Sequence, residues 1–459
     1  MSIIIPANSA VSGGDQDNSL RFNKGSSDYL NRTFGTSTSE GTWTYSVWLK
    51  ISDPAFIDNH VFFSGGGASD NRTQLYFGET TGTLNIYRSI SGSTVNLESD
   101  ASFRDPSAWY NLCVQNNAGT VAAYINGVAV TLDGSSLGTN VINKSDTVHK
   151  IGRGATGTYT SSYMSEIVFI DGTVVAPTGF GEFDDSGIWK PIDVSGLTFG
   201  NNGFYLDFED SSALGDDVSG NGNDFTVNNL TAIDQSTDTP TNNFCTLNPL
   251  TKRSGGTLTE GNLQYTASTA DSSIFGTMAI PPGMKVYFEV KLVSNTAQNS
   301  IGIHSLYDGG DGAFVKGGSE TGTYSFKPRG SGSVTQYFNN GSSTDTSIDN
   351  PANNTILGVA INNNNGQIHY HIAGTYINSS DPTDNDPVAL VTGFGGASEQ
   401  YLHFSLDTTT TQPSNQFNFG SPPYSESGGN SDGNGYGNFA HAVPSGYYAL
   451  NTKNLAEYG

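Results

Sequence analysis

Apolar and polar residues alternate with a period of two along most of this chain, in short runs separated by Gly, Asn, Ser and Asp. The runs form two stretches, one from Leu20 to Asp171 and one from about Thr257 to Leu450. Many short strands with frequent turn signals are typical of β-sandwiches and jelly rolls. The pattern therefore predicts an all-β chain with two sandwich or jelly-roll domains and almost no helix.

The predicted domain boundaries follow changes in this pattern. A polar N-terminal arm covers residues 1–16, a first β-domain 17–175, a connector with extra strands 176–256, and a second β-domain 257–459. The arm holds a β-prone run, Ile3 to Ile5, which would either add to a partner's sheet edge or form an edge strand of this chain. We expect the irregular connector to be docked, because it carries aromatic residues that need burial: Trp189, Phe204, Tyr205, Phe208 and Phe225.

Local sequence adds detail to the first domain. Asn126-Gly127 lies between two β-type runs and predicts a two-residue hairpin turn. Trp48 and Trp109 lie in aromatic strand centres, and we expect both to anchor the first core. Because Trp48 lies on the strand face opposite to Tyr45, this expectation requires a strand that is covered on both sides.

Composition and charge exclude several classes of partner. The chain has 459 residues, of which 19 are basic and 43 acidic, giving a formal net charge of −24. Such a field repels nucleic acid and anionic lipid, and no run is long enough to span a membrane. We expect neither nucleic acid binding nor membrane insertion, and no signal peptide at the start of the sequence. Two cysteines in so long a chain indicate synthesis in a reducing compartment.

Three sets of motifs resemble known families. "SSDYLNRTF", "GTWTYSVWLK" and "SSYMSEIVFIDGT" resemble a concanavalin A-like (laminin-G-like) lectin domain, whereas "KVYFEVKL", "ILGVAINNNNGQIHYHIAG" and "FNFGSPPY" resemble a SPRY domain, itself a β-sandwich. The joining stretch, with "FGEFDDSGIWKPIDVSG" and "DDVSGNGNDFTVNNL", is similar to a segment common in structural proteins of marine tailed bacteriophages, and "PSGYYALNTKNL" fits the same group.

The resemblance implies a non-enzymatic virion surface protein: a fibre, a tail component or a capsid decoration. Its partners would be other virion proteins, further copies of itself and a host surface glycan. It would be made in the bacterial cytoplasm and act on the virion surface. Two alternatives stay open, a laminarinase-like glycoside hydrolase and a decoration protein that binds no ligand.

The hydrolase alternative needs a set of carboxylates in a Glu-x-Asp-x-(x)-Glu pattern on one strand face. The nearest matches are Glu182-Phe183-Asp184 and Asp207-Phe208-Glu209, and neither is followed by the third carboxylate. We therefore interpret both as solvent-facing acids beside buried Phe, and predict that the chain is not an enzyme.

One turn is a candidate calcium site. The stretch "DDVSGNGND" offers hard oxygen ligands of the kind that Ca²⁺ selects. Its candidate ligands are Asp216, Asp217, Asn221, Asn223 and Asp224. An Asx-rich turn that needs no metal is the alternative. No other cofactor is predicted.

Two polar loops with aromatic flanks are candidate carbohydrate sites, because sugars are held by Asp or Asn side chains and an aromatic ring. The first set is Asp70, Asn71, Arg72 and Tyr76, and the second is Asn434, Tyr436 and Asn438. We expect the second loop to be flexible unless a partner orders it. His369 and His371 share one face of a predicted strand, and we expect both to face solvent.

Overall fold

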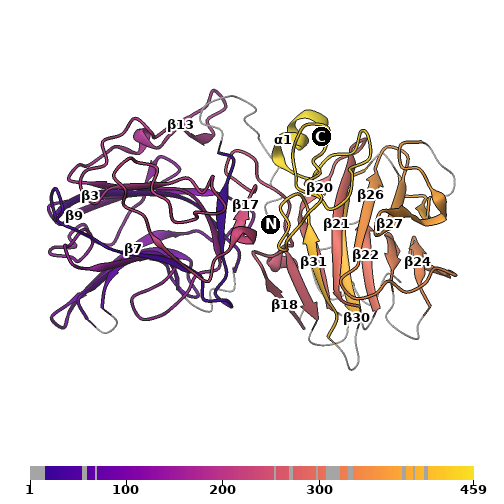
Figure 1. Cartoon of the computed structure of the whole chain (residues 1–459), viewed down its shortest axis with the longest axis horizontal. Coiled ribbons are helices and arrows are strands. Elements are labelled where there is room, and N and C mark those ends of the chain that lie inside the picture. The colour runs from indigo at the N-terminus through magenta and orange to yellow at the C-terminus, as the bar shows by residue number, and fades with distance from the viewer. Residues whose placement is uncertain are drawn as a thin grey trace. The chain divides into compact units, whose positions relative to one another are not determined.

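The computed structural model describes residues 16–53, 59–67, 70–252, 255–267, 272–295, 298–305, 321–328, 334–384, 389–395, 398–407 and 412–459. Nearly all of the predicted arm, including Ile3 to Ile5, lies outside the described residues. The chain divides between Asn242 and Asn243 into two compact units (Figure 1). Residues 176–242 of the predicted connector therefore belong to the first unit, and residues 243–256 to the second.

Two antiparallel sheets face each other in the first unit (Figure 1). One sheet has the strand order β10 (Val128–Ala129), β9 (Thr120–Ile125), β8 (Tyr110–Asn117), β3 (Thr42–Ile51), β12 (Ser162–Asp171), β1 (Ser19–Phe22) and β17 (Gln235–Ser236), with β15 (Phe204–Leu206) also beside β12. The other, seven-stranded sheet has the order β16 (Thr226–Asn228), β2 (Tyr29–Thr33), β11 (Val148–Ile151), β4 (His60–Gly66), β5 (Arg72–Phe77), β6 (Thr83–Ile90) and β7 (Ser93–Ser102).

The core of the first unit lies between these sheets. The rings of Tyr45 and Phe63, from opposite sheets, stack with centroids 4.9 Å apart. Phe204 of the connector stacks on Phe169 at 5.7 Å, so the connector closes part of this core. Asn126 and Gly127 both have positive φ, at 49° and 75°, and form the predicted turn between β9 and β10.

Strand β3 is buried on both faces, as the position of Trp48 requires, but Trp48 and Trp109 do not anchor the main core. They form a second cluster with Tyr163 and Trp189. Trp189 belongs to a small hairpin of β13 (Gly181–Phe183) and β14 (Trp189–Pro191), and its Nε1 donates to Asn111 Oδ1 at 3.1 Å. The expected burial of both tryptophans is thus confirmed, but they pack outside the main core because the layer that covers this face comes from the connector.

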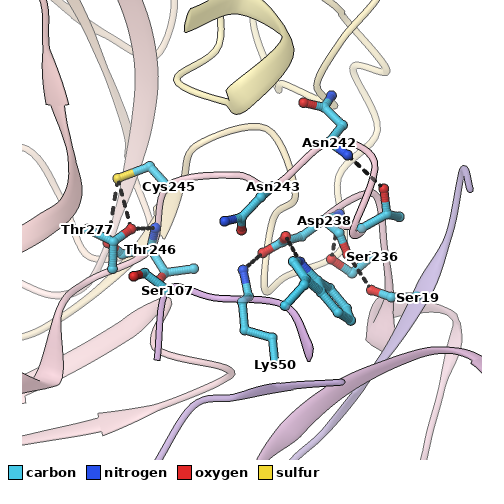
Figure 2. A network of polar contacts seen from close by, with 12 residues as sticks. Ser19, Lys50, Ser107, Ser236, Asp238, Asn242, Asn243, Cys245, Thr246 and Thr277 are labelled. Atoms are coloured by element: carbon cyan, nitrogen blue, oxygen red, sulfur yellow. Dashed lines mark hydrogen bonds and ion pairs between the residues drawn. The ribbon is translucent and has the colours of Figure 1, made fainter. Parts of the chain in front are cut away.

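The end of the connector is tied to β3 by a buried ion pair, shown in Figure 2. Lys50 Nζ contacts Asp238 Oδ2, and Trp109 Nε1 donates to Asp238 Oδ1 at 3.1 Å. Ser19 Oγ donates to the Asp238 carbonyl at 2.6 Å, and the Asp238 N–H donates to Ser236 Oγ at 3.1 Å. The predicted docking of the connector is thus confirmed.

The second unit is also built from two antiparallel sheets (Figure 1). One has the order β18 (Gly256–Thr259), β19 (Gln264–Ala267), β31 (Ser414–Asn418), β21 (Lys285–Ser294), β26 (Ile356–Asn362), β27 (Gln367–Ile372) and β28 (Thr375–Tyr376), with β29 (Val391–Thr392) beside β27. The other has the order β20 (Ser272–Ile280), β30 (Gln400–Asp407), β22 (Gln298–His304), β23 (Thr323–Lys327), β24 (Gln336–Asn339) and β25 (Ser342–Asp345). The prediction of an all-β chain is confirmed.

Helical structure is confined to short segments in the part of the chain that the structure describes. They are α1 (Thr452–Tyr458) and the 3₁₀ turns η1 (Pro177–Gly179), η2 (Ala232–Asp234), η3 (Pro249–Thr251) and η4 (Ile377–Ser379). None of these helices is long and apolar enough to cross a membrane.

The expectation that His369 and His371 face solvent was wrong, since both are buried. The chain after β31 covers this face of the sheet, and the ring of His441 lies 4.8 Å from that of His371. Gly374 N–H donates to His371 Nδ1, so Nε2 carries the proton and donates to Tyr287 Oη at 2.8 Å. Burial lowers the pKa of His371 to about 3, and the imidazole is neutral at physiological pH.

Candidate functional site

A row of polar side chains crosses the outer face of the seven-stranded sheet. Strand register places one such residue on each strand, in the order Thr226, Asn31, Lys150, Ser64, Gln74, Tyr87 and Asn96. The alternate residues, such as Leu75 and Ile86, lie in the core. Ser64 and Gln74, in the middle of the row, are buried, while the residues toward both ends are partly or fully exposed. The row thus has two sectors that are open to solvent. One is formed by Tyr87 and Asn96, and the other by Thr226, Asn31 and Lys150.

Tyr87 is the centre of the sector on β5, β6 and β7. The guanidinium carbon of Arg72 lies 5.4 Å from the centroid of its ring, an attractive cation–π arrangement. Tyr76 is its diagonal neighbour across β5 and β6, which by sheet geometry places the two residues about 7–8 Å apart. Both tyrosines are half-buried, so part of each ring is open to solvent.

Polar groups on β6 and β7 border these rings. Asn96, directly opposite Tyr87, is exposed, and its Nδ2 donates to Asn85 Oδ1 at 2.7 Å. Glu98 lies opposite Asn85 and accepts a hydrogen bond from Thr83 Oγ1 at 2.7 Å. Burial, with the negative charge of Glu98, raises the pKa of Tyr76 to about 12, so its hydroxyl is neutral.

The first predicted set divides between this face and the turn beside it. Arg72 and Tyr76 lie on the face, whereas Asp70 ties the β6–β7 turn, accepting from Ser89 Oγ at 2.8 Å and Gly92 N–H at 3.0 Å. These hydrogen bonds lower the pKa of Asp70. Asn71 is an exposed turn residue with φ of 54°. Sequence reasoning missed Tyr87, Asn96 and Glu98, although their alternation with apolar residues in "TLNIYRS" and "STVNLES" was available as a signal.

The second predicted set lies in a loop that the chain itself orders, contrary to the expected flexibility. The buried Asp432 carboxylate accepts from the N–H groups of Asn434, Tyr436 and Ala449 at 2.9–3.0 Å. Asn434 Nδ2 donates to Asn454 Oδ1, and its Oδ1 accepts from Tyr458.

The other two members of this set also have internal contacts. Lys453 Nζ lies 5.6 Å from the Tyr436 ring. Asn438 donates its N–H to the Gly420 carbonyl at 2.8 Å. The side-chain polar atoms of Asn434 are thus engaged in hydrogen bonds within the unit.

Most candidate ligands of the acidic turn form hydrogen bonds within the protein itself. The side-chain N–H groups of its two asparagines donate to backbone carbonyls: Asn221 Nδ2 to those of Gly200 and Gly203, and Asn223 Nδ2 to that of Gly203. Asp217 accepts N–H groups on both oxygens, including that of Tyr205 at 2.9 Å.

Arg32 supplies the positive charge at this turn. Its guanidinium donates to Asn223 Oδ1 and is attracted by Asp217 and Asp224. The remaining candidate, Asp216, is exposed, and its pKa is raised by partial desolvation and by Asp224 and other acids. In the described chain, no three His, Cys, Asp or Glu side chains are grouped as metal ligands. The geometry is that of an Asx-rich turn around an arginine.

Comparison with known proteins agrees with the geometry of the first unit. Residues 24–176 match the family model described as the concanavalin A-like lectin/glucanases superfamily. The first unit contains a concanavalin A-like domain. No curated protein matches the chain.

Two solved structures are similar to parts of the chain. A native heptameric SAP-like pentraxin from Limulus polyphemus has 16% identity and a TM-score of 0.27, over 35% of this chain and 78% of the pentraxin. Domain 4 of AbnA, a GH43 extracellular arabinanase from Geobacillus stearothermophilus solved with arabinotriose, has 16% identity and a TM-score of 0.26, over 30% of this chain and 64% of that domain.

The carboxylates singled out in the sequence do not meet on the polar face of the concanavalin A-like domain. Glu182 belongs to the β13–β14 hairpin, whose Phe183 is 52% exposed rather than buried as expected. Asp207 and Glu209 flank Phe208, which is buried in the core as expected. Glu98 is the single carboxylate among the described positions of β5, β6 and β7 that regular pairing places on the polar face, and Asp100 of β7 lies in the irregular part of that pairing.

Proposed function

We propose that the concanavalin A-like domain binds carbohydrate on the outer face of β5, β6 and β7. The observation that carries this proposal is the pair of partly exposed rings, Tyr76 and Tyr87, bordered by Arg72, Asn96 and Glu98. An aromatic ring covers the apolar face of a sugar, and amide, guanidinium and carboxylate groups bind its hydroxyls. The strand scaffold fixes these side chains before a ligand arrives, which lowers the entropic cost of binding.

We further propose that the face binds sugars without cleaving them. Glycoside hydrolysis needs two carboxyl groups, about 5–5.5 Å apart in retaining enzymes and about 6.5–9.5 Å apart in inverting enzymes. These strands carry one further carboxylate, Asp100 of β7, but the pairing of β7 with β6 is irregular between Glu98 and Ser102, so the register does not place it beside Glu98 on the polar face. Neither Ser102 nor Phe103 supplies the third carboxylate of the Glu-x-Asp-x-(x)-Glu pattern. A panel of β-glucans incubated with the whole chain tests this proposal, and release of reducing ends would favour the laminarinase alternative.

For the biological setting we propose the surface of a bacteriophage particle. The support is the resemblance of the joining stretch and of "PSGYYALNTKNL" to structural proteins of marine tailed phages. In that setting the chain would contact other virion proteins and further copies of itself, and the polar face would bind a host surface glycan. Mass spectrometry of purified particles tests the setting: a high copy number indicates capsid decoration, a low one a tail or fibre, and absence from particles contradicts it.

The binding proposal is tested with a glycan array probed with the full chain. Tyr87→Ala should lower the affinity for any bound glycan at least about tenfold, because loss of a central aromatic contact typically costs 2 kcal/mol or more. Tyr436→Ala is the matched variant in the other predicted loop and should bind normally. An array without any bound glycan would favour the alternative of a ligand-free decoration protein.

A further inference from the structure

The second open sector of the polar row contains a cationic cluster that the proposed sugar platform does not use. The guanidinium carbon of Arg153 lies 4.7 Å from the ring centroid of Tyr29 and 5.2 Å from that of Tyr159. The two rings are 6.1 Å apart, so the three side chains form a triangle. All three are half-buried. Stacking on two rings holds the planar guanidinium in place while its N–H edge stays able to bind a ligand.

The backbone beneath this cluster is held on both sides. Gly152 has φ of 80°, and a Cβ there would lie 2.6 Å from Phe22, so the turn into Arg153 requires glycine. Gly154 N–H donates to the Thr158 carbonyl at 2.7 Å, which closes the loop. Ser64 Oγ donates to the Arg153 carbonyl at 2.7 Å and fixes the loop to β4. Arg153 is therefore preorganised rather than a freely rotating surface arginine.

A second cation lies beside the first without a counter-ion. Lys150 is half-buried, and its pKa is lowered by burial and by the charge of Arg153. Within the described residues, neither side chain has a carboxylate at ion-pair distance, and the buried Arg153 Nε makes no hydrogen bond. Acidic residues outnumber basic ones 43 to 19 in this chain, so two adjacent cations without an acidic neighbour are an exception to its composition.

We propose that Lys150, Arg153, Tyr29 and Tyr159 form a subsite for an anionic substituent, a sulfate or a carboxylate, on the glycan that the face binds. A planar guanidinium accepts the two oxygens of such a group with paired hydrogen bonds. The subsite rests on the proposed sugar-binding function and narrows it to acidic glycans.

The pairing register of the seven-stranded sheet gives the distance that a ligand of both sectors must span. Lys150 and Tyr87 occupy the same row, separated by β4 and β5, so three strand spacings of about 4.8 Å place them about 14 Å apart. An oligosaccharide spans that distance and a monosaccharide does not. Acidic oligosaccharides should therefore bind more tightly than acidic monosaccharides.

The experiment compares binding of the full chain to a neutral galactan, to the same polymer after sulfation, and to a polyuronate. We expect wild type to prefer at least one acidic polymer, and Arg153→Gln to lower that affinity at least about tenfold, the effect of one lost charge-assisted hydrogen bond. The preferred polymer identifies sulfate or carboxylate as the group bound. Lys144→Gln removes an equal charge from an exposed position and should leave the preference unchanged.

The outcomes separate the two proposals. The anionic subsite is overturned, and the sugar platform kept, by the following combination. Wild type binds neutral and acidic polymers equally, Arg153→Gln binds them like wild type, and Tyr87→Ala binds them more weakly. Binding of acidic polymers that Lys144→Gln weakens as much as Arg153→Gln shows a general charge effect and also overturns the subsite. Absence of binding to every glycan tested overturns both. Thermal unfolding of each variant confirms that it is folded.

Discussion

Lys50 and Asp238 are 188 residues apart in sequence and form an ion pair whose side chains are only 1% and 2% exposed. Lys50 lies on β3, in the middle of a sheet, and Asp238 lies in the last part of the connector (Figure 2). Trp109 Nε1 also donates to this carboxylate. The pair therefore fastens the end of the connector to the sandwich.

Breaking this pair should strongly destabilise the first unit. Asp238→Asn keeps an acceptor for Trp109 but removes the carboxylate charge that the buried Lys50 ammonium contacts, which typically costs about 3–5 kcal/mol. Because all four tryptophans lie in residues 43–189, tryptophan fluorescence during urea unfolding reports on this unit alone. Asp53→Asn breaks the partly exposed Lys24–Asp53 pair and should cost no more than about 1 kcal/mol. Equal costs for the two variants would contradict the role assigned to the buried pair.

The tryptophan cluster predicts a second stability effect. Trp48 is 4% exposed and packs with Trp109, Tyr163 and Trp189. Trp48→Ala should lower the stability of the first unit by about 3–5 kcal/mol, as expected for a buried Trp, and circular dichroism melting measures it. Phe183→Ala, at a site that is 52% exposed, serves as the control and should change stability much less. A Trp48→Ala melting curve like that of wild type would mean that this cluster does not hold the connector.

Removal of calcium should not alter stability. The acidic turn has Arg32 as its cation, and its asparagine amides donate to carbonyls. Melting curves in EDTA and in millimolar calcium should therefore coincide, whereas Asp217→Ala should cost about 2–3 kcal/mol by leaving buried N–H groups without acceptors. A higher melting temperature in calcium would restore the metal hypothesis.

How much the sequence predicted depends on whether a feature is local. The period-two pattern and the Asn126-Gly127 turn are local signals, and both the strands and the turn were predicted correctly. The burial of His371 was not predicted, because it depends on a segment around His441 that is distant in sequence. In the same way, the covering of Trp48 comes from the hairpin that carries Trp189.

The candidate site also combines features that are local in sequence with features that depend on the pairing of strands. Arg72 and Tyr76 were selected from the sequence because they lie close together in a polar stretch with an aromatic flank, and the structure places both on β5. Tyr87 was missed because its position beside them depends on the register between β5 and β6. The triangle of Tyr29, Arg153 and Tyr159 depends on β2 and β11 being neighbours, which alternation within one strand does not reveal.

The last prediction concerns Glu166, which lies in a β-bulge of β12 with φ of 51°. Tyr205 Oη donates to its Oε2 at 2.5 Å. Burial, together with the negative charges of Asp207, Glu209 and Asp193, raises the pKa of Glu166 to about 8, despite the opposing effect of the Tyr205 hydrogen bond. The carboxyl is thus protonated in the folded state at neutral pH.

This raised pKa should make the first unit lose stability as pH rises. Between pH 4.5 and about 8 the folded state retains a proton that the unfolded chain has released, so the free energy of unfolding falls by at most about 1.4 kcal/mol per pH unit. Burial lowers the pKa of His149 to about 3, so between pH 3 and 6.5 this residue makes the free energy of unfolding rise with pH. The window from pH 6.5 to 8 is therefore the clearest. Glu166→Gln should flatten the tryptophan-detected stability profile there, while Glu182→Gln, at an exposed position, should keep the wild-type slope. A Glu166→Gln profile as steep as that of wild type would show that Glu166 is already ionised in the folded state.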